Sequence, residues 1–183
     1  MKLYYYDQRK MTPFLKPVLI WDAQGDVQYT LEREKTLKPG FRLLLCDANG
    51  EQIAAIRQKL AALHTTFYVQ IRGKELTVCL KRTLQGMPYC EVSELGWIAD
   101  GGFIMHREYE MRAGEALIAC VHEPPSSEMT SGNGLAFLAN VMRPRNPQFT
   151  KEDCCEIDFS DALAADELVS VVMAIEAAGV AAG

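Results

Sequence analysis

Residue types that could support catalysis or bind a metal occur in this chain, but their spacing does not fit that chemistry. The three histidines, His64, His106 and His122, lack the H-x-x-x-H or H-E-x-x-H spacing of a local zinc site. No two cysteines have C-x-x-C spacing; the six are Cys46, Cys79, Cys90, Cys120, Cys154 and Cys155. Neither a G-x-S-x-G elbow nor a G-x-x-x-x-G-K-[ST] loop is present. We therefore predict no catalytic residues, no metal site and no cofactor.

Four basic residues are the candidate ligand-binding site. Arg57 and Lys59 share one face of a predicted strand because they lie two residues apart, and Lys81 and Arg82 end another predicted strand. If the two strands lie close together, the four side chains form a cationic patch that suits a phosphate group. The alternative is a set of solvated strand-end charges paired with nearby carboxylates. Those carboxylates are Glu51, Glu75 and Glu91.

Composition and charge bound the class of protein. The chain has 183 residues, of which 49% are hydrophobic and 23% charged, values typical of a globular protein, and we predict one domain over residues 1–183. The net charge of −5 argues against a nucleic-acid-binding protein. The N-terminal residues lack the apolar core of a signal peptide. We therefore expect a cytoplasmic protein with reduced cysteines.

Alternation of apolar and polar side chains predicts antiparallel strands over the first two thirds of the chain. Phe67, Val69 and Ile71 alternate with polar neighbours, and residues 76–81 repeat this period of two. Turns with Asp and Gly separate such runs, as in residues 22–25 and 47–50. The pattern predicts a meander of hairpins, which either closes into a barrel or splits into a sandwich.

One helix is predicted, at the C-terminal end of the chain. Ser160 or Asp161 is the expected N-cap and Gly179 the expected end, and the apolar side chains between them cover the whole circumference. Such a helix must be buried on all sides. The run from Leu168 to Gly183 is shorter than the roughly 20 apolar residues of a membrane span and contains Glu176. We therefore predict a core helix surrounded by strands.

Residues 122–151 depart from this plan. They contain Pro124-Pro125, Ser131-Gly132-Asn133-Gly134 and Arg143-Pro144, which are loop signals around a short apolar stretch. We interpret this segment as a Pro/Gly-rich loop insertion within the single domain.

Three stretches of the sequence resemble the LURP-one-related family, which has the tubby C-terminal-like fold. Ile56-Arg57-Gln58-Lys59-Leu60 resembles the family's Gln-Lys strand, and Trp97 to Phe103 followed by Tyr109-Glu110-Met111 resembles its Gly-Asp-Phe/aromatic stretch. Residues 166–177 resemble its terminal helix. The resemblance implies a mainly β fold, a closed antiparallel barrel of about twelve strands around the buried C-terminal helix. The wider fold includes phosphoinositide-binding domains and phospholipid scramblases, although fold alone does not fix function.

Three functional hypotheses follow. The first is a non-enzymatic module that binds an anionic phospholipid head group or another phosphorylated ligand through Arg57, Lys59, Lys81 and Arg82, at the periphery of a membrane. The second is an intracellular interaction or scaffold domain whose protein partner contacts residues 122–151, since binding residues concentrate on loops. The third is an enzyme of unknown class with a site between the barrel and this loop.

Overall fold

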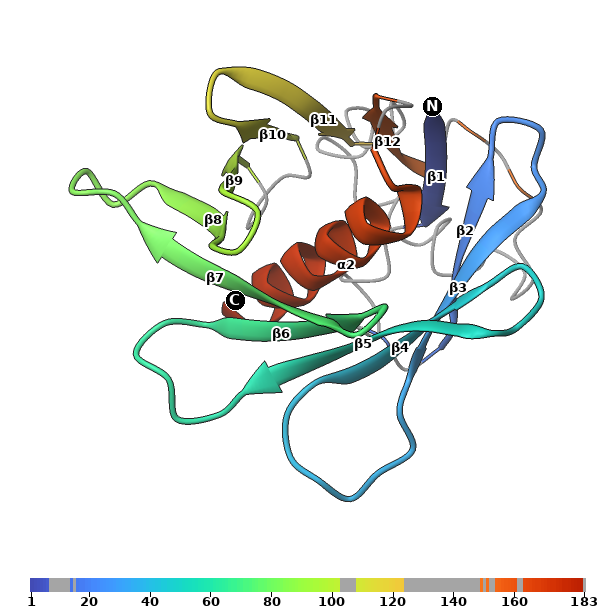
Figure 1. The fold of residues 1–183 in the computed structure, drawn as a ribbon, viewed down its shortest axis with the longest axis horizontal. Helices are drawn as coiled ribbons and strands as arrows, with labels where there is room; N and C mark the ends of the chain where they lie inside the picture. Colours follow the sequence, from blue (N-terminus) through green and yellow to red (C-terminus); the bar gives the residue numbers. More distant parts are fainter. Residues whose placement is uncertain are drawn as a thin grey trace, which may run out of the picture.

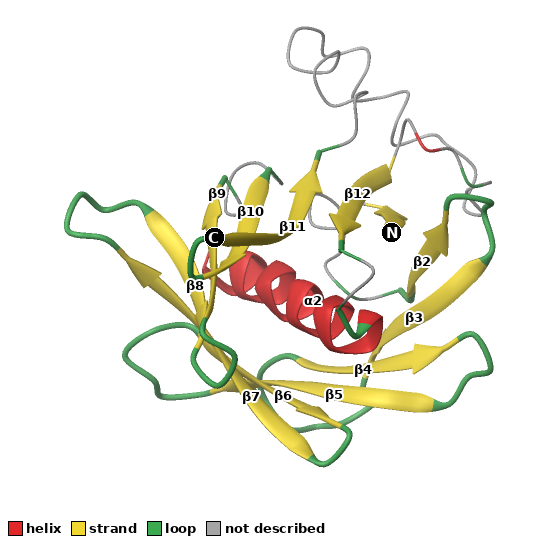
Figure 2. Ribbon diagram, turned by 45° about the horizontal axis from the view of Figure 1, so that its top comes forward, coloured by secondary structure: helices red, strands yellow, loops and turns green. Residues whose placement is uncertain are grey.

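The computed structural model confirms the predicted fold class: twelve antiparallel strands form one closed barrel around a C-terminal helix (Figures 1 and 2). It describes residues 1–6, 14, 16–102, 108–123, 149, 151, 154–160 and 163–182. The strands are β1 (Lys2–Tyr6), β2 (Val18–Asp22), β3 (Val27–Arg33), β4 (Arg42–Asp47), β5 (Gln52–Lys59), β6 (Thr66–Ile71), β7 (Lys74–Arg82), β8 (Pro88–Val92), β9 (Trp97–Gly101), β10 (Tyr109–Ala113), β11 (Ala116–His122) and β12 (Cys154–Phe159). The helix is α2 (Ala165–Ala182).

Neighbouring strands along the chain pair with each other, and β1 pairs with β12 to close the barrel. Closure leaves no open sheet edge, which is why the barrel rather than the sandwich satisfies the backbone hydrogen bonds of a long meander. Most of the predicted insertion, residues 122–151, lies outside the described residues; residues 122, 123, 149 and 151 are described.

The two ends of the barrel differ in the length of their connections. At the short-turn end, residues 23–26, 48–51, 72–73, 93–96 and 114–115 join strands through two to four residues. At the loop end, the described connections 34–41, 60–65 and 83–87 are longer. Because the strands are antiparallel, these three loops must all leave the barrel at the same end.

The hairpin turns at the short-turn end form as their sequence predicts. Asp22 Oδ1 accepts hydrogen bonds from the backbone N–H groups of Gln24 and Asp26, at 2.9 and 3.0 Å. Asp47 Oδ1 accepts from Asn49 and Glu51 in the same way. These backbone donors hold the pKa of both carboxyls below its usual range. Gly25 and Gly50 follow with φ of +92° and +81°, which a residue with a Cβ rarely adopts.

Helix α2 fills the barrel. Every residue from Leu168 to Gly179 is buried. The helix contacts β5, β6 and β7 and lies inside the ring of strands (Figure 2). The inward side chains of the strands, among them Ile56, Phe67 and Val78, are fully buried against it. A helix that is apolar on all sides and twelve strands that each have one apolar face thus form one core around the helix. No helix among the described residues is long and apolar enough to cross a membrane.

The helix begins later and ends later than predicted. It starts at Ala165, so Ser160 is not the N-cap, and Asp161 lies outside the described residues. Gly179 does not end the helix, which continues to Ala182. Gly179 is buried within the barrel, where packing offsets the roughly 1 kcal/mol that an interior glycine costs.

Polar contacts hold the first turn of the helix at the short-turn end. Tyr29 donates its hydroxyl to Asp166 Oδ1 at 2.9 Å, and Arg72 forms an ion pair with the same carboxylate. Lys74 pairs with Glu167 at 3.4 Å. Burial, and then the bond to Asp166, raises the pKa of Tyr29. The acidic first turn also complements the positive end of the helix dipole.

Glu176 lies on the buried part of the helix and is only 2% exposed. Tyr109, on β10, donates its hydroxyl to Glu176 Oε1 at 3.3 Å. A carboxyl group in an apolar core needs such partners, because a buried polar group without a hydrogen bond costs several kcal/mol. The Glu176 that interrupts the apolar run in the sequence therefore faces the barrel wall rather than solvent.

Val172→Asp tests the position of the helix. Val172 is fully buried, so we expect a carboxylate there to destabilise the fold by at least about 4 kcal/mol and to leave the chain unfolded. Circular dichroism of the purified variant measures this. Val27→Asp, at a 37% exposed strand position, is the control and should fold. A cooperatively folded Val172→Asp variant would contradict the buried helix.

Gly101 allows β9 and β10 to approach each other beside Tyr109. A Cβ at Gly101, where φ is +131°, would lie 2.6 Å from the backbone oxygen of Glu108. We expect Gly101→Ala to lower the free energy of unfolding by about 3 kcal/mol. Gly114→Ala is the matched control, since Gly114 also has positive φ but no atom within 4 Å, and it should cost about 1 kcal/mol. Equal losses in a urea titration would contradict the close approach.

Candidate functional site

The four predicted cations lie on two strands that are separated by a third. Strand β6 pairs with both β5 and β7, so β5 and β7 run in the same direction on either side of it. Lys59, at the end of β5, lies opposite Thr66, which lies opposite Cys79 on β7. Lys81 and Arg82 follow Cys79 at the same end. Lys59, Lys81 and Arg82 therefore all belong to the loop end of the barrel.

Arg57 lies on β5 two residues before Lys59, further from the loop end, and its neighbour on β4 is a second arginine. It is opposite Arg42 of β4, whose Nε donates to Glu34 Oε2 at 2.8 Å. This hydrogen bond holds the pKa of Glu34 below its usual range, and the charges of Arg42 and Arg57 add to the effect. Glu34 thus pairs with Arg42, and the charge of Arg57 leaves the three side chains with a net positive charge.

The other three cations are partly engaged. Lys81 Nζ lies 2.5 Å from Glu91 Oε2, and this hydrogen bond raises the pKa of Lys81. Arg82 donates to the backbone oxygen of Gly86 at 3.1 Å, within the β7–β8 loop. Lys59 Nζ lies 5.6 Å from the centre of the Tyr68 ring, in a cation–π contact. The predicted pairing with Glu91 is therefore present for one of the four.

Three leucines at the loop end were not singled out by the sequence patterns. Leu37, Leu63 and Leu84 are 105%, 94% and 110% exposed, one on each of the β3–β4, β5–β6 and β7–β8 loops. Leu60 and Met87, on the second and third of these loops, are also at least half exposed. Single exposed leucines are ordinary, but a group on adjacent loops at one end is a feature of interaction surfaces. The usable signal was a leucine flanked by polar or small residues within each long connection.

Basic residues are frequent in the same three loops and in the strand ends beside them. We define the basic loop surface as residues 33–42, 57–65 and 80–88, which contain eight Lys or Arg and one carboxylate, Glu34. The basic residues are Arg33, Lys35, Lys38, Arg42, Arg57, Lys59, Lys81 and Arg82. At the short-turn end, residues 22–27, 47–52, 71–75, 92–97 and 112–117 contain seven Asp or Glu and three Lys or Arg. The three described loops at this end and the strand ends beside them thus carry a net positive charge, in a chain of net charge −5.

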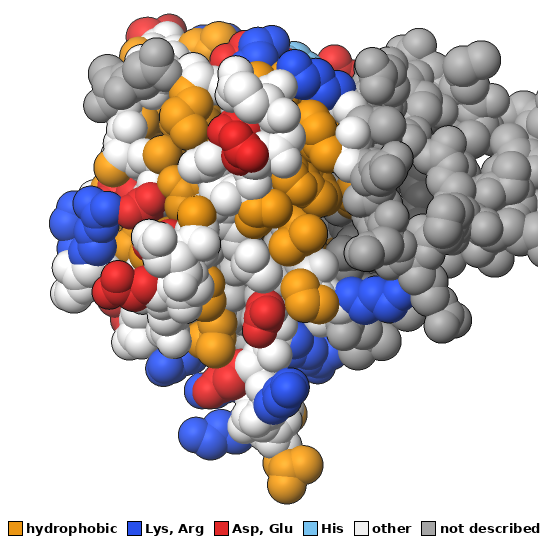
Figure 3. Space-filling model, turned by 90° about the vertical axis from the view of Figure 1, so that its right-hand side faces the viewer, with side chains coloured by type: hydrophobic (Ala, Val, Ile, Leu, Met, Phe, Trp, Pro, Cys, Tyr) orange, Lys and Arg blue, Asp and Glu red, His pale blue; other side chains and the backbone are white. Residues whose placement is uncertain are grey.

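The β3–β4 loop shows this combination on the surface. In Figure 3 it forms the protrusion at the lower edge, which ends in a hydrophobic side chain with Lys and Arg side chains close behind it. An apolar tip with cations behind it suits a boundary between an apolar and an anionic phase.

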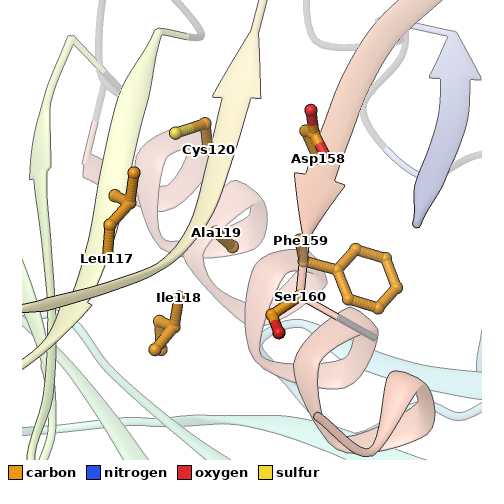
Figure 4. A pocket seen from close by; sticks show the side chains of 7 residues that line it. All are labelled: Leu117, Ile118, Ala119, Cys120, Asp158, Phe159 and Ser160. Atoms are coloured by element: carbon orange, nitrogen blue, oxygen red, sulfur yellow. The ribbon is translucent and has the colours of Figure 1, made fainter. Parts of the chain in front are cut away.

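One hollow and the grouping of titratable side chains bear on the hypothesis of an enzyme. A hollow of about 340 Å³ lies along β11 and β12, and Figure 4 shows its lining side chains. Its Cys120 and Asp158 point apart, and burial raises the pKa of the Cys120 thiol, which disfavours the reactive thiolate. Among the described residues, no three His, Cys, Asp or Glu side chains are grouped so that they could hold a metal ion.

Comparison with known proteins gives one distant relative. No protein-family model matches the chain, and no solved structure matches it. Over 108 residues, or 59% of the chain, it is 26% identical to the uncharacterized protein YxjI of Bacillus subtilis (strain 168). The matched part spans 65% of that relative's length, which is less than two thirds.

Proposed function

We propose that this protein is a non-enzymatic module that docks on anionic membrane surfaces, at the periphery of the cytoplasmic face, through its basic loop surface. The observation that carries the proposal is the placement of Leu37, Leu63 and Leu84 at the tips of three loops on one end of the barrel, among eight basic residues. The leucines enter the interface between head groups and acyl chains, and the cations bind the lipid phosphates.

Energetic magnitudes support two signals acting together. A fully buried leucine gains roughly 1.5–3 kcal/mol, and a basic residue close to an anionic leaflet gains about 1 kcal/mol. Neither contribution alone gives stable attachment, since peripheral proteins usually need an apolar and an electrostatic signal. The acidic short-turn end opposes adsorption in the reverse orientation.

We also propose that the chain is a member of the LURP-one-related family with the tubby C-terminal-like fold. Support comes from the closed barrel of twelve strands and the central helix, which are the architecture that the resemblance implies. Lipid binding within this fold is an analogy, so the proposal of membrane docking rests on the loops of this chain.

Liposome co-sedimentation tests the docking surface. Vesicles of neutral lipid, of phosphatidylserine and of phosphoinositide are compared at physiological salt, with wild type and two variants. The triple variant Leu37→Ser, Leu63→Ser, Leu84→Ser should lose at least tenfold in affinity for both anionic vesicles, since the three side chains no longer enter the apolar layer. A variant with Arg57, Lys59, Lys81 and Arg82 changed to Gln should lose at least tenfold and show a weaker dependence on salt.

Controls lie at other places on the barrel. Leu117→Ser changes a 51% exposed leucine at the short-turn end, and Lys74→Gln removes a cation there, so both should bind as wild type does. Phosphoinositide binding well above phosphatidylserine binding would indicate a specific head group, and equal binding would indicate charge alone. If wild type binds none of the three vesicles, membrane docking is wrong.

Glu34→Gln provides a gain of function. It removes the single carboxylate of the basic loop surface, so we expect about fivefold tighter binding to phosphatidylserine vesicles, the equivalent of about 1 kcal/mol per charge. Glu115→Gln changes net charge by the same amount at the short-turn end. Its affinity should stay within twofold of wild type. An equal gain for both variants would show that total charge, rather than the loop end, controls binding.

A further inference from the structure

The outer wall formed by β1, β2 and β12 is aromatic where an outward face is normally polar. Tyr4, Tyr6 and Trp21 lie there, and Tyr6 meets Trp21 edge-on with ring centres 5.3 Å apart. Tyr4 and Trp21 are each only 5% exposed, and Cys154 on β12 is 1% exposed. Together with Phe149 they form a second apolar cluster, separate from the core around the helix. Side chains on the outside of a barrel become this buried only when something covers them.

The cover is part of the same chain. The Phe149 ring packs against Tyr4 and Trp21, with ring centres 5.8 and 5.6 Å apart. Lys151 places its Nζ 5.4 Å from the centre of the Tyr4 ring. Phe149 and Lys151 thus occupy the wall with one ring and one cation, at a spacing of two residues.

The chemistry of the wall suits that pair of side chains. Trp and Tyr rings bind another ring edge-on and a cation face-on through their quadrupole. Strand β12 adds the carboxylates of Glu156 and Asp158 on the same outward face, both within 4 Å of Lys2. Leu19, on the outward face of β2, is 37% exposed, so the apolar strip extends beyond the covered part.

We infer that the wall at Tyr4, Tyr6 and Trp21 is a peptide-binding site for a segment with an aromatic residue followed two positions later by a cation, occupied here by Phe149 and Lys151 of the same chain. A partner with this pattern binds by displacing the internal segment. The site is on the side wall and does not depend on membrane docking at the loop end.

Two glycines provide a matched pair of variants. Gly25 and Gly50 occupy equivalent turns with similar positive φ. A Cβ at Gly25 would lie 2.9 Å from the Phe149 ring, whereas a Cβ at Gly50 has no atom within 4 Å. Gly25→Ala therefore pushes Phe149 from the wall and Gly50→Ala does not, although both variants carry the same backbone strain.

Fluorescence anisotropy of a labelled peptide with the sequence of residues 145–153 tests the site. We expect the full-length Phe149→Ala and Gly25→Ala variants to bind this peptide at least tenfold more tightly than wild type and Gly50→Ala do. Adding Trp21→Ala to Phe149→Ala should abolish binding. A peptide with Ala in place of its Phe should bind none of them. Circular dichroism verifies that each variant is folded.

The result that would overturn the inference is a folded Phe149→Ala variant that does not bind the peptide, or binds the Ala-containing peptide equally well. Equal gains for Gly25→Ala and Gly50→Ala would also overturn it, since they would reflect general loosening. Concentration-dependent dimers of Gly25→Ala that the peptide dissociates would support the site, with a second copy as occupant. Vesicle binding by the same variants should be unchanged, which separates this inference from the proposed function.

Discussion

The structure depends on one constraint: a helix with apolar side chains around its whole circumference has to be enclosed on all sides. A sheet packed on one face would leave the opposite face of α2 in water, and each large apolar side chain left there costs roughly 1.5–3 kcal/mol. Twelve strands that close into a barrel remove this cost and satisfy their own edges at the same time. The polar contacts of Asp166 and Glu167 then fix the direction of the helix, with its N-terminal turn at the short-turn end of the barrel.

A filled barrel places function on its surface. Because α2 and the inward side chains occupy the interior, the protein differs from barrels that hold a small ligand inside. Along most strands, apolar side chains point inward and polar side chains point outward. Two kinds of place therefore remain available for binding: the longer loops, and any stretch of the outer wall where the outward side chains are apolar. The basic loop surface is the first, and the aromatic wall at Tyr4 and Trp21 is the second.

Sequence patterns predicted the architecture well because it follows from periodicity. The strand alternation, the Asp–Gly turns and the all-round apolar helix each follow from local residue types. Periodicity left both a barrel and a sandwich open, and the family resemblance implied the closed barrel that the structure has. The bounds of the helix were wrong at both ends, since tertiary packing, rather than Ser160 or Gly179, decides where it begins and ends. For the candidate site, the sequence identified the four cations. That they lie toward the same end of the barrel depends on β6 pairing with both β5 and β7, and residue spacing does not predict this pairing. The exposure of Leu37, Leu63 and Leu84 depends likewise on which loops share an end.

The exposed leucines and the aromatic wall differ in their state in the free protein: the leucines lie in solvent, whereas the aromatic side chains are already covered. Leu37, Leu63 and Leu84 contact too little to stabilise the fold, so their side chains cost solubility without a structural return. In the proposed docking mode, burial in the apolar layer of a membrane supplies that return, and the cations of the same loops favour an anionic leaflet. Tyr4 and Trp21 are already buried, by a segment remote in sequence, and their exposure would itself cost free energy. A surface that is unstable when bare needs an occupant at all times, so any partner at this wall competes with Phe149, whereas a membrane at the loop end has no such competitor among the described residues.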